Sequence, residues 1–387
     1  MSALFPTYAR KPLSFVKGEG TVLTDDNGTE YLDFTSGIAV VNLGHSHHSP
    51  LEALQKQSGK LWHVSNLFEN KLQEDLAAML VDNTPLNLAF FCNSGAEANE
   101  AAIKLAKKHT GKKKIITFQQ SFHGRTFAAM SATGQEKIKT GYGPMVPEFD
   151  IVPYNDSSAL LHAADAQTAA IMLEVVQGEG GIIAAEPGFL HTINRLCKEK
   201  NILLIVDEIQ TGMGRTGKRY AFEHTILVPD IVTLAKGLGN GYPIGAMLGK
   251  AFLKDSFGPG SHGTTFGGNH LACAVASSVV QTIFNEAFLK ETEKKGAFFM
   301  HLLQSCLHDQ PLFKELRGKG LLIGIQCSNV AAPIVEELQN NGLLTVPAGM
   351  DVIRLLPPLT VSHEELQKAA AVIKGVFVSH SKLTEKV

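Results

Sequence analysis

Two apolar runs decide the fold class, ILLIVD at residues 202–207 and DIVTLA at residues 230–235. Three similar runs precede them: LAFFC (88–92), KIITF (114–118) and AAIMLEVV (169–176). None alternates polar with apolar residues, and helical patterns separate several of them. This arrangement is typical of parallel strands that are buried on both faces. The sequence therefore predicts an α/β fold with a mostly parallel central sheet.

The pattern changes after about residue 270, where helical stretches, short strand-like runs and a closing helix near 362–378 follow. At the other end of the chain, residues 20–34 predict a hairpin, because they contain an Asn-Gly dipeptide that tolerates a tight turn. We therefore expect a large domain over residues 60–265 and a smaller part built from residues 1–59 and 266–387.

Composition excludes several classes of protein. The 387 residues are 44% hydrophobic and 19% charged, which is typical of a globular protein. The 35 Lys and Arg residues nearly balance the 37 Asp and Glu residues, which argues against a nucleic-acid partner. The five cysteines are dispersed and odd in number, so we expect a reducing compartment and no metal cluster. No apolar run approaches the roughly 18 residues of a membrane span, and the first residues lack a signal-peptide core. We expect a cytoplasmic protein.

Three short sites follow three of the predicted strands. Gly95 and Ala96 begin a helix whose free amides suit a phosphate, Asp207 ends a buried strand, and Lys236 ends the next one. Taken singly, each has an ordinary alternative: a helix cap, a structural carboxylate and a solvated lysine. Together they would meet at one sheet edge. Pyridoxal phosphate needs this set, namely an amine for a Schiff base, a carboxylate for the pyridine nitrogen and a phosphate seat.

Eight stretches also carry a resemblance to a known family. They are FTSGIAVVNLGH (34–45), FFCNSGAEANEAAIK (90–104), SFHGRT (121–126), LEVVQGEGG (173–181), VDEIQTGMGRTG (206–217), LAKGLGNGYPIGA (234–246), HGTTFGGN (262–269) and VIRLLPPL (352–359). Through them the chain resembles the class III, ornithine-type aminotransferases of pyridoxal-phosphate fold type I, and within these the bacterial acetylornithine group. The resemblance implies a homodimer with shared active sites and small-molecule substrates.

The resemblance implies roles toward the cofactor. Lys236 would bind it covalently and move the proton between the two reacting carbons. Asp207 would pair with the pyridine nitrogen, and Gln210 would lie beside the ring hydroxyl. Phe122 would stack on the ring. The phosphate would be held by the amides of Gly95 and Ala96, and by Thr265 of the neighbouring subunit.

Four further residues would handle the substrate. Arg125 matches an arginine that holds a carboxylate, which suits its planar fork. Thr264 would reach the substrate from the neighbouring subunit. Arg354 sits in an apolar stretch, where an unpaired guanidinium is costly, and Glu179 matches its family partner. We hypothesise that Glu179 is a gate that covers Arg354 for one substrate and frees it for the other.

The implied reaction moves the δ-amino group of N2-acetyl-L-ornithine to 2-oxoglutarate. It gives N-acetyl-L-glutamate 5-semialdehyde and L-glutamate, a step of arginine biosynthesis. Ornithine or 4-aminobutyrate aminotransfer is the nearest alternative, because sequence defines the donor pocket poorly. An NAD-dependent oxidoreductase resting on GMGRTG (212–217) is a weaker one, since no acidic residue follows about 20 positions on. A non-catalytic binder is a third. His45, His47 and His48 are interpreted as polar loop residues and not as metal ligands.

Overall fold

The computed structural model describes residues 3–384. Residues 1–2 and 385–387, the ends of the predicted smaller part, lie outside the described residues.

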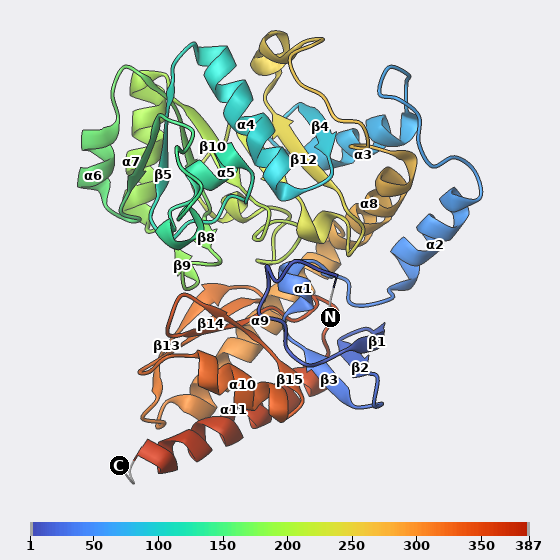
Figure 1. Ribbon diagram of the computed structural model, residues 1–387, viewed down its shortest axis with the longest axis vertical. Helices are drawn as coiled ribbons and strands as arrows, with labels where there is room; N and C mark the ends of the chain where they lie inside the picture. The colour runs from blue at the N-terminus through green and yellow to red at the C-terminus, as the bar shows by residue number, and fades with distance from the viewer. Residues whose placement is uncertain (1–2, 385–387) are drawn as a thin grey trace.

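A seven-stranded sheet forms the centre of the upper half in Figure 1. Its order is β4 (Leu88–Cys92), β12 (Gly245–Gly249), β11 (Ile231–Leu234), β10 (Leu203–Asp207), β7 (Thr168–Leu173), β5 (Lys114–Phe118) and β6 (Phe149–Val152). Neighbouring strands run parallel except at β12, which is antiparallel to both β11 and β4. The predicted α/β fold with a mostly parallel central sheet is confirmed.

The inner strands of this sheet are buried on both faces, as their uninterrupted apolar runs indicate. In β10, Ile205 packs in the apolar cluster that contains helix α4 (Gly95–Thr110). Its neighbours Leu204 and Val206 belong to the cluster on the opposite face, with helix α7 (Pro187–Lys200). The upper half also contains α3 (Lys71–Val81), α5 (Phe127–Ala132), α6 (Ser157–Ala163) and α8 (His270–Ile283).

Two smaller sheets lie in the lower half of Figure 1. One is antiparallel, with the order β13 (Phe313–Lys319), β14 (Leu322–Cys327), β17 (Val352–Leu355) and β16 (Val346–Ala348). The other has the order β1 (Phe15–Glu19), β2 (Val22–Asp25), β3 (Glu30–Asp33) and β15 (Leu343–Leu344). Because β15 pairs with β3, segments more than 300 residues apart share a sheet. The predicted domain boundaries near residues 60 and 265 stay a prediction.

The remaining elements connect these sheets or cover them. They are α1 (Ser36–Ala39), α2 (His48–Ser58), β8 (Val176–Gln177), β9 (Ile183–Ala184), α9 (Glu286–Leu307), α10 (Ala332–Asn340) and α11 (His363–Thr384). The expected strand over 169–176 is shorter than predicted: it ends at Leu173, and Val176 enters the β8–β9 pair. Helix α2 ends at Ser58, where Gly59 is the C-cap.

The histidine-rich loop is partly helical. His47 caps α2 and His48 is its first residue, while His45 pairs with Asp33 at 2.8 Å. Among the described residues, no group of three His, Cys, Asp or Glu side chains is arranged to hold a metal ion. The segment GMGRTG forms turns with no helix directly after it, and a dinucleotide-binding turn requires that helix.

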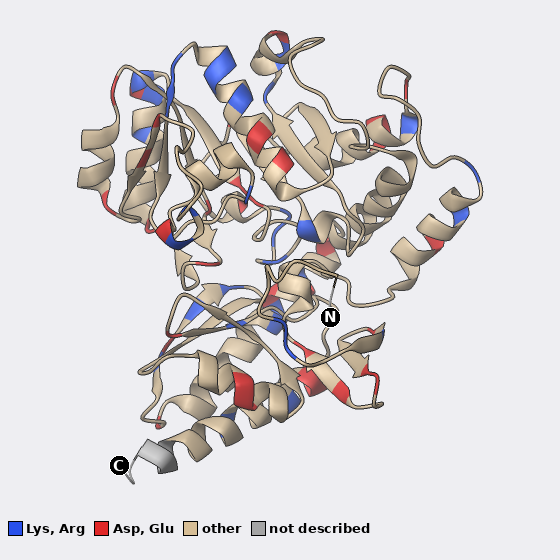
Figure 2. Cartoon of the chain, in the orientation of Figure 1, with Lys and Arg blue, Asp and Glu red and all other residues tan. Residues whose placement is uncertain are grey.

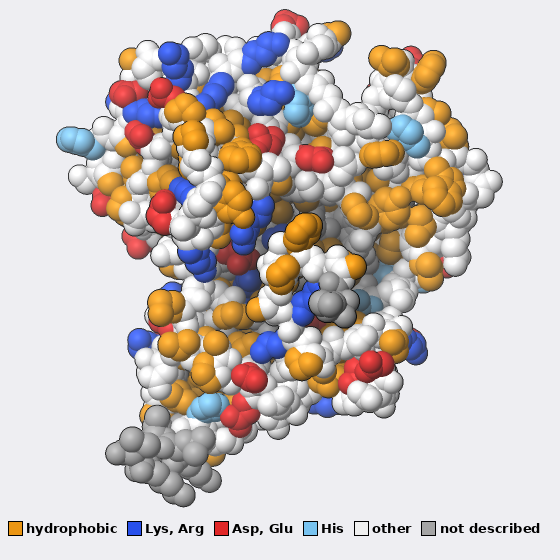
Figure 3. All heavy atoms as spheres, in the orientation of Figure 1, with side chains coloured by type: hydrophobic (Ala, Val, Ile, Leu, Met, Phe, Trp, Pro, Cys, Tyr) orange, Lys and Arg blue, Asp and Glu red, His pale blue; other side chains and the backbone are white. Residues whose placement is uncertain are grey.

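Charge and apolarity are distributed differently over the surface. In Figure 2 basic and acidic positions are interspersed over both halves. In Figure 3 apolar side chains gather near α2 and α3, where Leu61, Trp62, Leu67 and Phe68 are exposed. Within residues 3–384, no single helix is long and apolar enough to cross a membrane; only the α8–α9 pair, bent by 68°, reaches that length and apolarity together.

Candidate active site

A cavity of about 390 Å³ lies where the carboxyl ends of β4, β10 and β11 meet. Gly95 and Ala96, Asp207 and Lys236 all line it, so the three predicted sites share one space. Its size suits a small organic ligand. This is the edge at which open α/β sheets bind ligands.

The N-terminus of α4 forms one wall of the cavity. Ser94 caps the helix by accepting a hydrogen bond from Glu97 N at 3.2 Å, and the first intrahelical bond runs from Ala98 N to Ser94 O. The amides of Gly95 and Ala96 precede that bond and are therefore available to an anion. A side chain on Gly95 would place its Cβ 2.8 Å from the end of the Ile209 side chain, which would have to shift.

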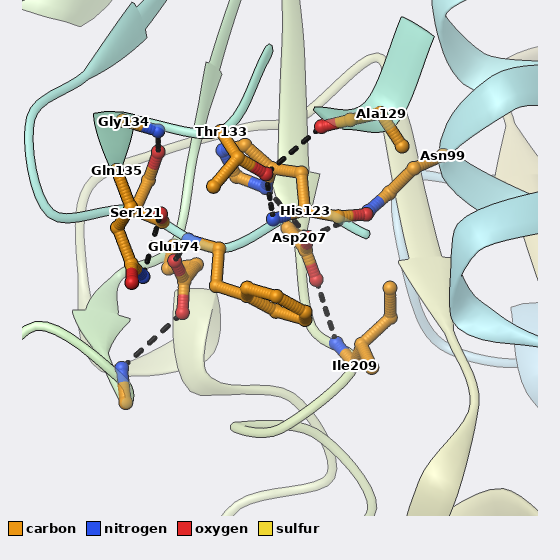
Figure 4. Close-up of polar contacts among 12 residues, drawn as sticks. Asn99, Ser121, His123, Ala129, Thr133, Gly134, Gln135, Glu174, Asp207 and Ile209 are labelled. Atoms are coloured by element: carbon orange, nitrogen blue, oxygen red, sulfur yellow. Dashed lines mark hydrogen bonds and ion pairs between the residues drawn. The ribbon is translucent and has the colours of Figure 1, made fainter. Parts of the chain in front are cut away.

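Asp207 is held by three donors, as Figure 4 shows. Its Oδ2 accepts from Asn99 Nδ2 at 2.8 Å and faces His123 Nδ1 at 2.8 Å, and its Oδ1 accepts from Ile209 N at 3.0 Å. His123 is fully buried, which opposes its protonation, but the bond to Asp207 and the charge of Asp207 outweigh burial and raise its pKa. The carboxylate therefore has a fixed orientation within the sheet edge.

Lys236 lies two residues after the end of β11 and has a φ of 43°, the left-handed conformation that residues other than glycine rarely adopt. Burial lowers the pKa of its amine, with an opposing effect from the charge of Glu179. A lysine with a lowered pKa is neutral more often and so becomes a better nucleophile.

Arg354 lies behind the cavity on β17 and is only 2% exposed. Its Nη1 contacts Glu179 Oε1 at 2.6 Å, Gln210 Oε1 at 3.1 Å and Gly178 O at 3.1 Å. Burial alone would raise the pKa of Glu179, but the Arg354 charge brings it below its usual value. Glu179 and Gln210 line the cavity and stand between it and the guanidinium.

The other predicted residues divide into two groups. Phe122 and Arg125 line the cavity, and the exposed Arg125 guanidinium lies 5.8 Å from the centre of the Phe122 ring. Thr264 and Thr265 do not line it. Thr264 Oγ1 accepts from Asn93 Nδ2 at 3.2 Å at the outer edge of the site, and Thr265 is exposed.

Sequence reasoning missed several residues around the cavity. Glu174 is buried beneath the cavity and directly follows β7. The argument from strand ends that identified Asp207 could therefore also have identified Glu174. His123 lies inside SFHGRT, but nothing in that stretch indicates burial against Asp207. Asn99, Asn93 and Tyr242 carry no sequence signal of their own.

Comparison with known proteins agrees with this geometry. The family model for class III aminotransferases matches residues 6–377. The chain is 55% identical over 386 residues to an acetylornithine aminotransferase of Bacillus subtilis, with all of both chains covered. It superimposes on an ornithine aminotransferase from Toxoplasma gondii, whose active site holds PLP at partial occupancy, with a TM-score of 0.94 at 35% identity, covering 100% of this chain and 94% of that one. An N-acetylornithine aminotransferase from Stenotrophomonas maltophilia gives 0.85 at 35% identity, with 96% and 97% covered. The chain therefore belongs to the pyridoxal-phosphate-dependent class III aminotransferases.

Proposed function

We propose that this aminotransferase moves the δ-amino group of N2-acetyl-L-ornithine to 2-oxoglutarate, giving N-acetyl-L-glutamate 5-semialdehyde and L-glutamate in arginine biosynthesis. The observation that carries the chemistry is the meeting of Lys236, Asp207 and the α4 N-terminus around one cavity. The choice of donor is supported by full-length relatives named acetylornithine aminotransferases at 49–55% identity.

The residues present fit pyridoxal phosphate. The amides of Gly95 and Ala96 would hold the phosphate, and the oriented carboxylate of Asp207 would keep the pyridine nitrogen protonated. The Phe122 side chain would cover one ring face, and Gln210 would lie beside the ring hydroxyl. When bound, the cofactor supplies the electron sink that stabilises negative charge on the substrate carbon.

Lys236 would then transfer protons to and from the substrate. Its Nζ, released once the substrate amine takes its place, would remove a proton from the δ-carbon of the donor. In the second half-reaction it would deliver a proton to C2 of 2-oxoglutarate. The lowered pKa caused by burial makes the amine a competent base near neutral pH.

Two arginines would recognise the substrates differently. The exposed Arg125 at the rim would bind the carboxylate of acetylornithine, which lies far from the reacting carbon. Glutamate and 2-oxoglutarate carry a carboxylate next to the reacting carbon, and Arg354 would bind it once Glu179 moves aside. With Glu179 in place, Arg354 is already paired and a donor without that carboxylate fits better.

Purified protein tests this function. It should be yellow, lose the colour on borohydride and then carry the cofactor on Lys236. Acetylornithine should show a higher kcat/KM than ornithine or 4-aminobutyrate. Because the chain superimposes on an ornithine aminotransferase with a TM-score of 0.94, ornithine is the second candidate donor. A preference for ornithine would overturn the proposed donor but not the chemistry.

We also propose a homodimer with shared active sites. The segment between α2 and α3 exposes Leu61, Trp62, Leu67 and Phe68, and Phe266 is 61% exposed next to Thr265. Exposed apolar groups of this kind typically mark an interface. Thr265 would reach the phosphate of the neighbouring subunit and Thr264 its substrate. Sedimentation velocity measures the assembly, and a monomeric holoenzyme would contradict the proposal.

A cytoplasmic location is proposed as well. All five cysteines are unpaired thiols, and they all lie in the described part of the chain. Thiols of this kind persist in a reducing compartment. Fractionation of the producing cell tests the location.

A further inference from the structure

Glu174 has no role in the chemistry described above, although it lies within the active site. It is 5% exposed, lines the cavity and directly follows β7. Its carboxylate makes two hydrogen bonds, both to backbone amides: Oε1 accepts from Phe122 N at 3.0 Å and Oε2 from Gly178 N at 3.2 Å (Figure 4).

Each bond fixes a different loop. Phe122 belongs to the loop after β5, which also carries His123 and Arg125. Gly178 begins the loop that carries Glu179, and its carbonyl accepts from Arg354 Nη1 at 3.1 Å. The Gly178 residue thus joins Glu174 on one side to Arg354 on the other. A Cβ at this position would lie 2.0 Å from Gln210 Oε1, so a side chain here would displace the Gln210 amide.

We propose that Glu174 is a positioning residue that fixes the Phe122 loop relative to the Glu179 loop. One carboxylate then positions both the Phe122 ring, which would contact the cofactor, and Glu179, which pairs with Arg354. This inference rests on the proposed function only in taking the cavity as the cofactor site.

The chemistry of the two donors explains why a carboxylate stands here. A backbone N–H donates and cannot accept, so both partners need an acceptor, and an ionised carboxylate offers one oxygen to each. Burying such a group is costly, and burial raises the pKa of Glu174 to about 7. His123, Asp207 and Lys236 are the charged neighbours that modulate this cost. A glutamine of the same shape would direct its NH₂ group at one of the two backbone N–H groups. Two donors would then face each other, and that hydrogen bond would be lost.

Glu208 offers a matched control in the same chain. It is 1% exposed, and burial raises its pKa to about 7 as well. Its Oε1 accepts from Phe222 N at 2.8 Å, but its Oε2 accepts from the Thr211 hydroxyl at 2.6 Å, and it does not line the cavity. The Ala221 amide also donates to the Glu208 carboxylate. Because a hydroxyl can also accept, Glu208→Gln can direct its NH₂ group at Thr211 and its oxygen at the backbone amides, whereas Glu174→Gln loses one of its two contacts.

The experiment compares Glu174→Gln, Glu208→Gln and the unmodified enzyme by hydrogen–deuterium exchange and by titrating each apoprotein with pyridoxal phosphate. We expect faster exchange in both segments 119–126 and 176–182 of Glu174→Gln, and cofactor binding weaker by about ten- to a hundredfold. Glu208→Gln should match the unmodified enzyme in both measurements.

Unchanged exchange in either segment, or equal effects of the two variants, would overturn the proposal. If Glu174→Gln does not fold, Glu174→Asp replaces it: the shorter carboxylate cannot span both amides, and unchanged exchange and cofactor affinity would then overturn the proposal. The exchange measurement on apoprotein needs neither cofactor nor substrate. Its result therefore remains valid even if the proposed function is wrong. An unmodified enzyme without aminotransferase activity would show separately that the proposed function is wrong.

Discussion

Arg354 Nη1 lies 2.6 Å from Glu179 Oε1. This ion pair links strand β17 to a residue that lines the cavity. The guanidinium is 2% exposed, so removing its partner leaves a buried charge with only the oxygens of Gly178 and Gln210. The pair is closed in this structure, and a substrate carboxylate has to compete with Glu179 for the same nitrogen. The two half-reactions should therefore respond differently to changes at Glu179.

Glu179→Gln tests the gate. A neutral amide binds Arg354 more weakly than a carboxylate, so the substrate carboxylate of 2-oxoglutarate or glutamate competes better. We expect the ratio of kcat/KM for the glutamate half-reaction to that for the acetylornithine half-reaction to rise by about tenfold or more. Single-turnover spectroscopy of each half-reaction measures this ratio. An equal change in both half-reactions would show that Glu179 is not a gate.

Lys236→Ala tests the amine. The variant should lose at least about a hundredfold in kcat, because among the described residues no other amine lines the cavity to move the proton. Borohydride should no longer attach the cofactor to the protein. Lys254→Ala, at an exposed position, is the control and should behave as the unmodified enzyme. Undiminished activity of Lys236→Ala is incompatible with the proposed chemistry.

Mixed dimers test the shared active site. Thr265→Ala and Lys236→Ala would each impair both sites of their own homodimer. A hybrid of the two contains one site with Lys236 from one chain and Thr265 from the other, so co-refolding should restore activity to roughly a quarter of normal. The activity of the mixture, compared with the sum of the separate variants, measures this. A simple sum means that Thr265 serves its own subunit.

Arg215→Ala tests a buried guanidinium outside the cavity. Arg215 is fully buried and donates to Leu321 O at 3.1 Å and to Asn42 Oδ1 at 2.6 Å, and burial lowers its pKa to about 9. Removing it leaves those acceptors unpaired, and we expect a loss of about 3 kcal/mol or more in the free energy of unfolding. Urea unfolding measures it. Arg219→Ala loses an exposed bond to Asp82 O and a cation–π contact with the Phe284 ring at 5.3 Å. It should cost about 1 to 2 kcal/mol, and a loss as large as that of Arg215→Ala would contradict this reasoning.

Glu208 should make stability depend on pH. Its pKa of about 7 lies above the ordinary glutamate value of 4.5, so between these two pH values the folded state keeps a proton that the unfolded state has released. The free energy of unfolding then decreases as pH rises from about 4.5 to about 7, by at most about 3 kcal/mol from this group. Glu208→Gln should flatten that decrease, as urea midpoints at pH 5 and 7.5 will show. Parallel curves for the two proteins would argue against a raised pKa.

Uninterrupted apolar strands are what sequence reasoning predicts best. The runs that form β5, β10 and β11 carry a strong signal because both faces of each strand are buried, and even the half-buried edge strand β4 keeps an uninterrupted apolar run. In contrast, β12 has glycine at both ends and reads as a loop, and β13, FKELRGK, reads as polar because it is mostly exposed or half-buried. Their pairing depends on tertiary neighbours that no local pattern reveals.

The site divides in the same way. Strand-end reasoning brings Gly95, Asp207 and Lys236 to one edge, because parallel strands end on the same side. The residues that hold them cannot be found this way, since contacts such as His123–Asp207 and Glu174–Gly178 depend on how loops pack. The proposed role of Thr265 stays a prediction, since it concerns a second chain.

The pairing of β3 with β15 has a consequence for synthesis. The ribosome must release Leu343 before the sheet started by the first residues can close, and Arg354 emerges later still. The nascent chain therefore carries an unpaired β3 edge during most of translation, when edges of this kind invite association with other chains. We expect chaperones to hold this segment, and truncation before Leu343 to yield aggregates instead of a smaller enzyme.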